Sequence, residues 1–580
     1  MKTLNVSTQS TSPTIRQWHE AGSLLSSALS NYLSLCKLLK ANSLQEGVHP
    51  KDLASHIDSA LGTLQVVSIP ELNDSLSALS RARNEILSPF SSIPEELLTK
   101  IFMDVVFLDV WRPQNPPNPQ PSSMEQSLTK IWRAISTLLA VCSTWRNIVV
   151  NHSIFWSTVT IYHASKRHFG RTMAPEISIP RAGEGALHLT AVLDAGSKPK
   201  EVKEMASHIA GRTAQLRTIN IRAPMLPMLW LFSALLESGT YPSLSELSLG
   251  QIGLMYDQTG MAPELFQVVR HNSDFWAPFT ELLRSLSVLR INAASFSWPH
   301  MTFSNQLVEL HLQQLVVGQN HTLAGLLNSA PELRRLKIIS VLTFHDSSEA
   351  GGTILLHNLE SLLLQDLYFN TLEFLLKSIV PSPQRLELHL TEHSKQIALN
   401  GLQMRAARIE DLYSILNLLS VHTLLLSYTS ISPTGTIERW LTDPELRVLL
   451  KCMPSIKILK MRGWLCNAET GKTLKRPQSE GLGDGEFFPK FEEIYMTSTE
   501  IFDQDALKDI IASHSPRKLV LGGDLYLQGG PDGCALYDGM GKLPGYEENP
   551  IGWLRSNVPE FHLLEFCDPA EFYSDIWQLW

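Results

Sequence analysis

Residues that could perform covalent or metal chemistry are scattered along this chain rather than grouped. No two of the six cysteines form a C-x-x-C pair, and no Cys/His cluster has the spacing of metal ligands. The H-E-x-x-H and G-x-S-x-G motifs of hydrolases do not occur in the sequence. We therefore predict no catalytic residue, no metal and no cofactor, and a chain that is not an enzyme. The cysteines are Cys36, Cys142, Cys452, Cys466, Cys534 and Cys567.

One short segment, Gly471-Lys472-Thr473, is similar to the end of a phosphate-binding loop. That loop requires a glycine five residues before Gly471, and Cys466 occupies this position. The segment is therefore not set up to cradle phosphate groups, and we expect no nucleotide site.

Composition narrows the class of protein further. The 580 residues are 44% apolar and 18% charged, and the net charge of −9 comes without a basic block, which argues against nucleic-acid binding. We expect no membrane span, since the most apolar long stretch contains Arg133 and Arg146. Residues 1–20 lack the apolar core of a signal peptide, and so few cysteines suit a reducing compartment. These features predict a cytoplasmic or nuclear protein.

A chain of this length needs more than one compact unit, and the first is predicted to be helical. Residues 1–13 are expected to form a disordered lead. Between residues 14 and 88, leucines recur at helical spacing, as at Leu35, Leu38 and Leu39. These stripes predict a helical hairpin that packs on the next domain, or alternatively a short dimerising coiled coil.

The segment 90–157 carries the most informative pattern. Pro94 and two glutamates open a helix with a broad apolar stripe, and a Pro-rich insertion at 112–121 then ends it. From Leu128 onward apolar residues again follow helical spacing, and a strand-like alternation comes after them. The first stripe contains Leu97, Leu98, Ile101 and Phe102.

An ordered string of motifs in this segment resembles the F-box, most closely that of F-box proteins from mushroom-forming fungi. The string is Ile-Pro-Glu-Glu-Leu-Leu-x-x-Ile-Phe at 93–102, Val-Cys-x-x-Trp-Arg at 141–146 and Phe-Trp at 155–156. The sequence departs from the family pattern in two places. Ile93 replaces the usual leucine, and the insertion at 112–121 is expected to weaken or reshape the contact with a partner.

The resemblance implies a three-helix module that binds another protein. A module this small cannot bury all of its apolar residues, and the remainder forms an exposed patch. In the family this patch packs on the S-phase-kinase-associated adaptor, which joins the F-box protein to a cullin scaffold. By resemblance, Trp145 and Trp156 hold the module together and fix it to the following domain; alternatively, all of these residues belong to the core of a helical linker. The residues implied in adaptor binding are Pro94, Leu97, Leu98, Ile101 and Val141.

From residue 158 to residue 580 the sequence repeats an apolar triad of the form L-x-x-L-x-L. Amphipathic helical patterns and a proline precede several copies, as before Leu333 and Ile456. Helix, proline and short strand in this order indicate a leucine-rich-repeat-like solenoid, in which each unit buries its triad by stacking on its neighbours. The triads begin at Leu216, Leu244, Leu286, Leu307, Leu333, Leu359, Val421, Ile456 and Phe491.

The repeats are degenerate. Regular leucine-rich repeats carry Asn or Cys three residues after the triad, and this chain has Leu315, Val341, Leu367 and Trp464 there. We therefore predict an α/β fold, in which an N-terminal helical region and a three-helix F-box precede an irregular solenoid. The aromatic-rich segment 547–580 is expected to cap the solenoid, with a binding peptide as the alternative.

The residue between the last two apolar positions of a triad should point onto the concave face of the sheet. These residues are mixed in charge, so they indicate no single type of ligand. They are candidates for contact with a target protein, and the alternative is a solvated sheet face. They include Arg290, His311, Lys337, Glu387, Lys460 and Tyr495.

Two functions follow from these patterns. The first is the substrate-recognition subunit of a cullin-type ubiquitin ligase, which binds the adaptor through the F-box and an unknown target protein through the solenoid. The alternative is a non-degradative repeat scaffold for protein–protein interaction, whose F-box is decayed or used for another partner.

Overall fold

The chain divides into two compact units, residues 1–94 and residues 95–580. The Pro-rich insertion predicted at 112–121 and most of the lead predicted at 1–13 lie outside the residues that the structure describes. The computed structural model describes residues 12–87, 90, 93–111, 123–163, 175–237, 239–253, 267–345, 352–381, 383–399, 403–417, 419–427, 429–431, 437–477, 487–525, 534–535, 550–564, 572, 577 and 579.

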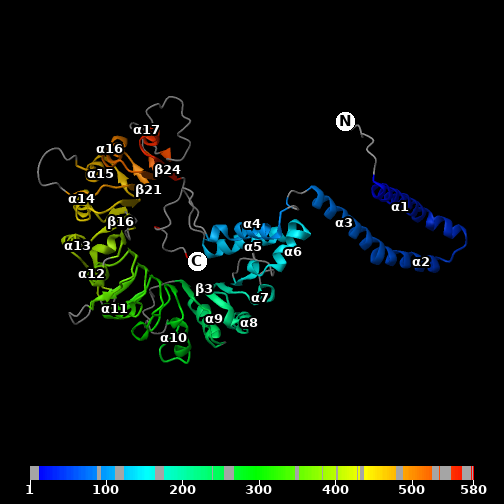
Figure 1. Cartoon of the computed structure of the whole chain (residues 1–580), viewed down its shortest axis with the longest axis horizontal. Coiled ribbons are helices and arrows are strands. Elements are labelled where there is room, and N and C mark those ends of the chain that lie inside the picture. Colours follow the sequence, from blue (N-terminus) through cyan, green and yellow to red (C-terminus); the bar gives the residue numbers. More distant parts are fainter. Residues whose placement is uncertain are drawn as a thin grey trace. The chain divides into compact units, whose positions relative to one another are not determined.

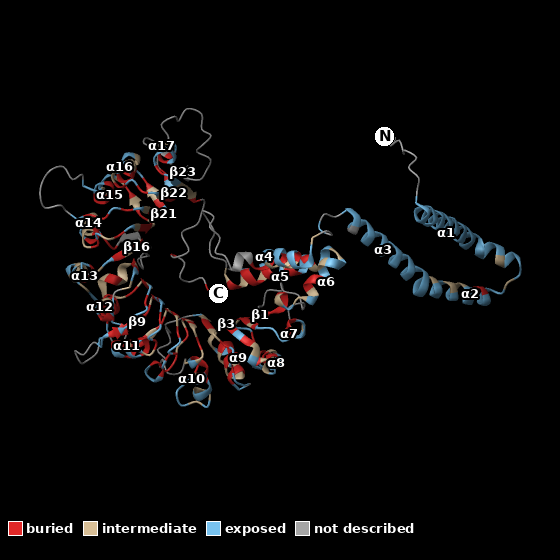
Figure 2. Ribbon diagram, viewed as in Figure 1, coloured by how far each residue is buried: buried red, intermediate tan, exposed pale blue. Residues whose placement is uncertain are grey.

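The first unit is helical and exposes its apolar stripes. Gly47, with φ of 81°, turns the chain between the first two helices. No residue of α1, which is described throughout, is buried, and Leu24 keeps 72% of its surface exposed (Figure 2). Within this unit α1 and α3 present their apolar stripes to solvent, and both the hairpin and the coiled coil stay predictions. The elements are α1 (Pro13–Gln45), α2 (Pro50–Thr63), a π-helical turn (Leu64–Ser68) and α3 (Ile69–Leu87).

Three α-helices and a 3-10 turn open the second unit. A capping box starts α5: the Gln126 backbone N–H donates to Ser123 Oγ at 3.3 Å, and the Ser123 N–H donates to Gln126 Oε1 at 3.0 Å. Residues 95–157 of the segment predicted as the F-box belong to the same compact unit as the predicted repeats, whereas residues 90–94 belong to the first unit. The elements are α4 (Glu95–Trp111), α5 (Met124–Val141), α6 (Ser143–Asn151) and η3 (Ser153–Trp156).

A 16-stranded sheet runs through the rest of the second unit. Its main path follows chain order from β1 to β23, with β20 and β24 joining at the sides, and its described strand pairs are parallel apart from β22–β23. The strands are β1 (Thr158–His163), β2 (Leu187–Leu193), β3 (Leu216–Pro224), β4 (Glu246–Ile252), β5 (Val288–Asn292), β6 (Glu309–Gln313), β8 (Arg335–Ile339), β11 (Ser361–Gln365), β13 (Arg385–Leu390), β16 (Val421–Ser427), β19 (Ile458–Arg462), β20 (Leu465–Cys466), β21 (Glu493–Ile501), β22 (Lys518–Leu525), β23 (Cys534–Ala535) and β24 (Glu560–Leu564).

Helices and four short two-stranded sheets form the connections. The helices are α7 (Pro175–Ala182), α8 (Pro199–Ala210), α9 (Met225–Glu237), α10 (Trp276–Arg284), α11 (Asn320–Asn328), α12 (Phe369–Ser378), α13 (Ile409–Leu416), α14 (Asp443–Lys451), α15 (Ala468–Leu474), α16 (Gln504–His514) and α17 (Pro550–Asn557). The short sheets pair β7 (Val316–Gln319) with β9 (Leu342–Phe344), β10 (Ile354–Leu355) with β12 (Ile379–Val380), β14 (Gln396–Ala398) with β15 (Met404–Ala406) and β17 (Thr429–Ile431) with β18 (Ile437–Arg439).

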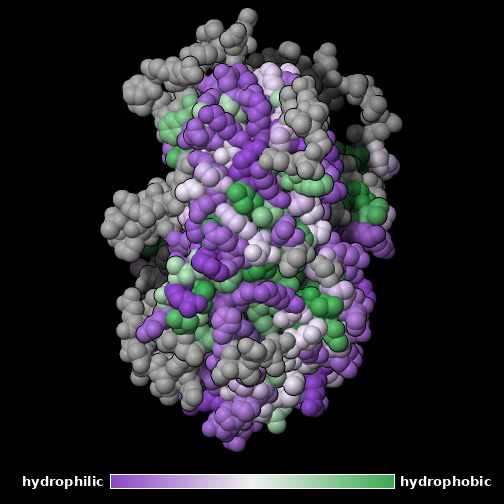
Figure 3. Space-filling view, turned by 90° about the vertical axis from the view of Figure 1, so that its left-hand side faces the viewer, coloured by the Kyte–Doolittle hydropathy of each residue, from purple (hydrophilic) through white to green (hydrophobic). Residues whose placement is uncertain are grey.

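The sheet and helices of the solenoid form two layers. Figure 1 shows strands along the inner side of an arc and helices α8 to α16 along its outer side. Buried residues gather where the two layers meet (Figure 2). The outer surface in Figure 3 is largely hydrophilic with smaller hydrophobic areas. Within the described part of the chain, no helix is long and apolar enough to cross a membrane.

Directly after five of the strands comes a residue whose backbone has the left-handed conformation. This residue explains how the backbone groups of the turn are hydrogen-bonded in repeats that lack the usual Asn. Its backbone N–H donates to a carbonyl of the next strand, as from Ser340 to Gln365 at 2.9 Å. The residue after it, such as Val341, is buried and apolar. Backbone bonds therefore replace the side-chain ladder, and the predicted α/β fold with a leucine-rich-repeat-like solenoid is confirmed. The left-handed residues are Ala293 (φ 57°), Gln314 (52°), Ser340 (49°), Asp366 (53°) and Gly463 (72°).

Three described residues near the end of the sequence lie on the face of the sheet. Phe572, Trp577 and Leu579, the described residues beyond β24, are all buried. The Phe572 ring lies 5.2 Å from that of His389 in β13, and both Trp577 and Leu579 form hydrogen bonds with Asn220 in β3. These three residues thus contact strands far from the end of the sheet, and the C-terminal cap stays a prediction.

Candidate functional site

Helix α4 carries apolar residues on two adjacent sides. Leu98, Phe102 and Val106 face the core and are at most 3% exposed. A second row lies one residue earlier in each turn, at intervals of four residues, and remains in solvent. We name this second row the α4 apolar row. It consists of Leu97 (52% exposed), Ile101 (44%) and Val105 (59%).

The five residues implied in adaptor binding lie at different depths. Leu97 and Ile101 belong to the α4 apolar row, and Val141 at the end of α5 is 52% exposed. Pro94, immediately before α4, is also exposed. Leu98 is only 3% exposed, so it is the most deeply placed of the five, and its contact with a partner stays a prediction. Its side chain points into the module, because the packed side of α4 passes through this position.

The two tryptophans assigned to holding the module together occupy junctions between elements. The Trp145 ring in α6 lies 4.7 Å from the Phe102 ring in α4. Trp156 is 2% exposed and donates its indole N–H to the Val149 carbonyl at 2.8 Å. Arg181 of α7 lies over the Trp156 ring at 4.4 Å, so this side chain also ties the module to the first helix that follows it.

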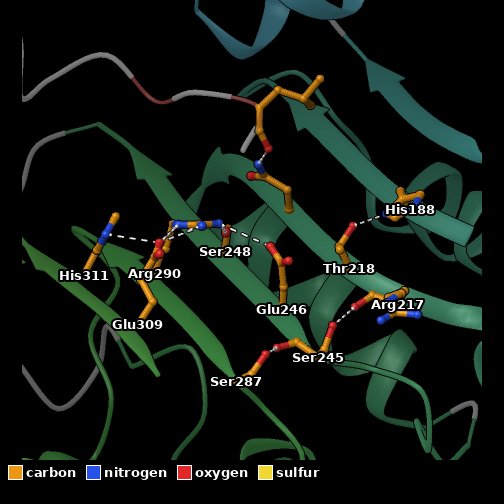
Figure 4. A network of polar contacts seen from close by, with 12 residues as sticks. His188, Arg217, Thr218, Ser245, Glu246, Ser248, Ser287, Arg290, Glu309 and His311 are labelled. Carbon is orange, nitrogen blue, oxygen red and sulfur yellow. Dashed lines mark hydrogen bonds and ion pairs between the residues drawn. The ribbon is translucent and has the colours of Figure 1, made fainter. Parts of the chain in front are cut away.

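On the sheet, three predicted target-facing residues lie side by side around a carboxylate. The strand registers place Arg290 opposite His311, and His311 opposite Lys337. Glu309 lies two residues before His311 and so shares its face. Arg290 Nη2 approaches Glu309 Oε1 at 2.7 Å (Figure 4). Arg335 Nη2 approaches the other carboxylate oxygen, also at 2.7 Å.

Cations and carboxylates alternate in this cluster. Glu309 is 7% exposed, and a carboxylate so deeply placed requires cations around it. The guanidinium of Arg290 also reaches Glu246 at 3.6 Å and Ser248 Oγ at 3.5 Å (Figure 4). The cluster can therefore bind ligands through hydrogen bonds and charge.

His311 contributes no charge to the cluster near neutral pH. Burial lowers its pKa well below 6.5, and the nearby cations Lys337 and Arg290 lower it further. The contact of 3.3 Å between His311 Nε2 and Glu309 is accordingly that of a neutral imidazole.

The other three predicted target-facing residues lie further along the sheet. Glu387 forms an ion pair with Arg385 of its own strand at 2.8 Å. Lys460 lies opposite Tyr495 in register, and its ammonium is 4.9 Å from the centre of the Tyr495 ring. Lys460 is only 8% exposed, so its side chain offers little surface to a ligand.

Sequence reasoning missed several residues of these surfaces. Asn220 occupies the same triad position as Arg290, so that rule could have selected it. Glu309 shares the period of two with His311, and Val105 continues the four-residue spacing of the α4 apolar row. Among the described residues, no group of three or more His, Cys, Asp or Glu side chains could hold a metal ion.

Comparison with known proteins adds little to this geometry. No known protein family and no curated protein matches the sequence. Among solved structures, the chain is similar to one from the crystal structure of the Rad7 and Elc1 complex in yeast. That match has 13% identity and a TM-score of 0.32, and covers 75% of this chain and 93% of that chain. So loose a superposition carries no argument, and the strand registers themselves define a leucine-rich-repeat-type solenoid.

Proposed function

We propose that this chain is the substrate-recognition subunit of a cullin-type ubiquitin ligase. The α4 apolar row binds an S-phase-kinase-associated adaptor, which links the chain to a cullin scaffold. The concave face of the sheet binds the target protein and so raises its concentration near the enzyme that transfers ubiquitin. No residue of this chain performs a covalent step, and the role belongs to the cytoplasm or nucleus.

The observation that carries this proposal is the exposed α4 apolar row. A helix packed on one side normally presents polar residues on the other, whereas Leu97, Ile101 and Val105 remain about half exposed. Such a row marks a surface for another protein, and covering each side chain contributes on the order of 1 kcal/mol. The resemblance of residues 93–156 to the F-box supports the choice of partner.

Co-purification tests the proposal. We expect the full chain to bring down the adaptor and the cullin scaffold from fungal cells, and a Leu97→Asp/Ile101→Asp variant to lose both. Two charges in a covered apolar contact disfavour the complex by several kcal/mol, by order of magnitude.

A matched control separates the site from a general effect of charge. Val448 in α14 is 42% exposed, similar to Ile101, so Val448→Asp places the same group on a helix outside the module. This control should retain the adaptor, and circular dichroism should show that the double variant is folded. Absence of adaptor from the wild-type sample would instead favour the repeat scaffold with a repurposed module.

A further inference from the structure

The concave face of the sheet already holds two residues from near the end of the sequence, Trp577 and Leu579. Trp577 is 8% exposed and Leu579 is 2% exposed. The Trp577 indole N–H donates to Asn220 Oδ1 at 2.8 Å, and the same amide donates its N–H to the Leu579 carbonyl. One side chain of β3 therefore recognises a tryptophan and the backbone two residues after it.

Two further contacts hold Trp577 in this place. The Trp577 ring lies against Gly250 of β4, where an added Cβ would approach ring carbon Cδ2 to 2.9 Å. The Met124 backbone N–H, at the start of α5, donates to the Trp577 carbonyl at 2.8 Å. The ring, the indole N–H and the carbonyl of this one residue thus contact β4, β3 and α5 respectively. We name this place the Asn220–Gly250 site.

The solenoid does not need this segment to complete its hydrophobic core. The residues that flank Asn220 in β3, Ile219 and Ile221, are at most 1% exposed and point to the opposite face of the sheet. Leu249, next to Gly250, is likewise buried at 0% exposure. The segment therefore covers a finished surface and does not fill a gap within the core.

Two buried polar atoms near these C-terminal residues have no hydrogen-bond partner among the described residues. Asn292 lies opposite Gly250 in register and is 6% exposed, yet its Oδ1 has no hydrogen-bond partner in the structure as described. The Nδ1 of His389, whose ring meets Phe572, has none in this part of the chain either. A buried polar atom without a partner is unfavourable, so another peptide could satisfy groups that the chain's own end does not.

We propose that the Asn220–Gly250 site binds a peptide with the pattern Trp-x-Leu, and that the chain's own Trp577 and Leu579 are exchangeable occupants. This proposal rests on the proposed function, and it identifies the target as a protein that presents such a peptide. The tethered occupant competes at an effective concentration of about millimolar. A target must exceed that competition, so the site admits only partners that bind more tightly or at a second contact.

Fluorescence anisotropy of a labelled peptide with the sequence of residues 570–580 tests the proposal. The full-length Trp577→Ala chain, which empties the site, should bind the peptide at least about tenfold more tightly than wild type does. Adding Gly250→Val, which fills the space of the indole ring, should remove that gain. Gly325→Val on the open surface of α11 is the matched glycine control and should leave binding unchanged.

Three other results of these binding and folding measurements would contradict the proposal. Equal affinity for wild type and Trp577→Ala, or no effect of Gly250→Val, would show that the peptide binds elsewhere or not at all. A Trp577→Ala chain that fails to fold would show that the segment belongs to the fold and is not exchangeable. The adaptor is absent from this assay, and Trp577→Ala should still co-purify with it, so failure here is distinct from failure of the proposed function.

Discussion

His514, at the end of α16, is fully buried and bonded at both ring nitrogens. Its Nε2 lies 2.8 Å from the Leu474 carbonyl, and its Nδ1 lies 3.3 Å from the Phe491 backbone nitrogen. This arrangement requires a neutral ring that donates from Nε2 and accepts at Nδ1. Burial accordingly lowers its pKa to about 4, so a second proton on this ring opposes the folded state.

The state of His514 predicts how stability changes in acid. The unfolded chain takes up a proton near pH 6.5, whereas the folded chain does so only near its pKa of about 4, so acid favours unfolding between these values. One such histidine contributes roughly 3 kcal/mol to this loss. His514→Gln keeps a donor and an acceptor without titrating, and its urea midpoint should fall less than that of wild type over this range. Parallel curves for the two proteins would contradict the assignment.

For single residues of α4, the sequence pattern predicted which are apolar but not which are buried. Leu97 and Leu98 are adjacent, equally apolar and both compatible with the helical period, yet they are 52% and 3% exposed. Only packing against α5 and α6 decides which of them is buried. The rotation of a helix that is apolar on two sides cannot be read from its own sequence.

Among the elements, the connection after each strand shows how degenerate repeats stay in register. The left-handed residues after β5, β6, β8, β11 and β19 each donate a backbone hydrogen bond to the next strand. Ala293, for example, donates to Gln313 at 3.0 Å with a φ of 57°. This conformation is unfavourable for any residue with a Cβ, so the bond forms at a conformational cost.

Replacing a left-handed residue by glycine should remove this conformational cost and so change the stability of the solenoid. Ala293→Gly retains the backbone bond to Gln313 and removes the Cβ, so it should stabilise the solenoid by about 0.5–1 kcal/mol after glycine's own entropy loss. The same change at Ala512, on the exposed side of α16, should instead destabilise by about 1 kcal/mol. Thermal unfolding of both variants measures the opposite signs, and destabilisation by both would mean that the Ala293 methyl group makes a favourable contact.

The elements themselves were partly predictable. The triads identify β4, β5, β6 and β8, because a buried strand residue alternates with one on the concave face. The backbone hydrogen bonds that replace the usual Asn were not predictable. The left-handed conformation on which they depend occurs at Ala, Gln, Ser and Asp, and these four side chains have no common feature that the sequence could reveal. In the second unit the sequence repeats predicted both the strands and their packing. In the first unit the regular helical spacing predicted the helices but not what they pack on.

For the second unit as a whole, the helical module and the solenoid are joined by several independent contacts. Glu125 of α5 forms an ion pair with Arg222 of β3 at 3.0 Å, and Arg181 of α7 lies over the Trp156 ring at 4.4 Å. A target on the concave face would thus be held at a defined place relative to an adaptor on α4. The link between Trp577 and Asn220 joins residues 357 positions apart, a contact that no local pattern of sequence could predict.

The affinity of the full chain for the S-phase-kinase-associated adaptor, measured by calorimetric titration, tests the central claim most directly. The wild-type chain should bind, and replacing Leu97, Ile101 and Val105 together by alanine should weaken binding by at least about 100-fold, since three covered side chains contribute on the order of 1 kcal/mol each. Val448→Ala should bind like wild type. An undetectable wild-type interaction, or wild-type affinity in the folded triple variant, would contradict the assignment of the α4 apolar row as the adaptor site.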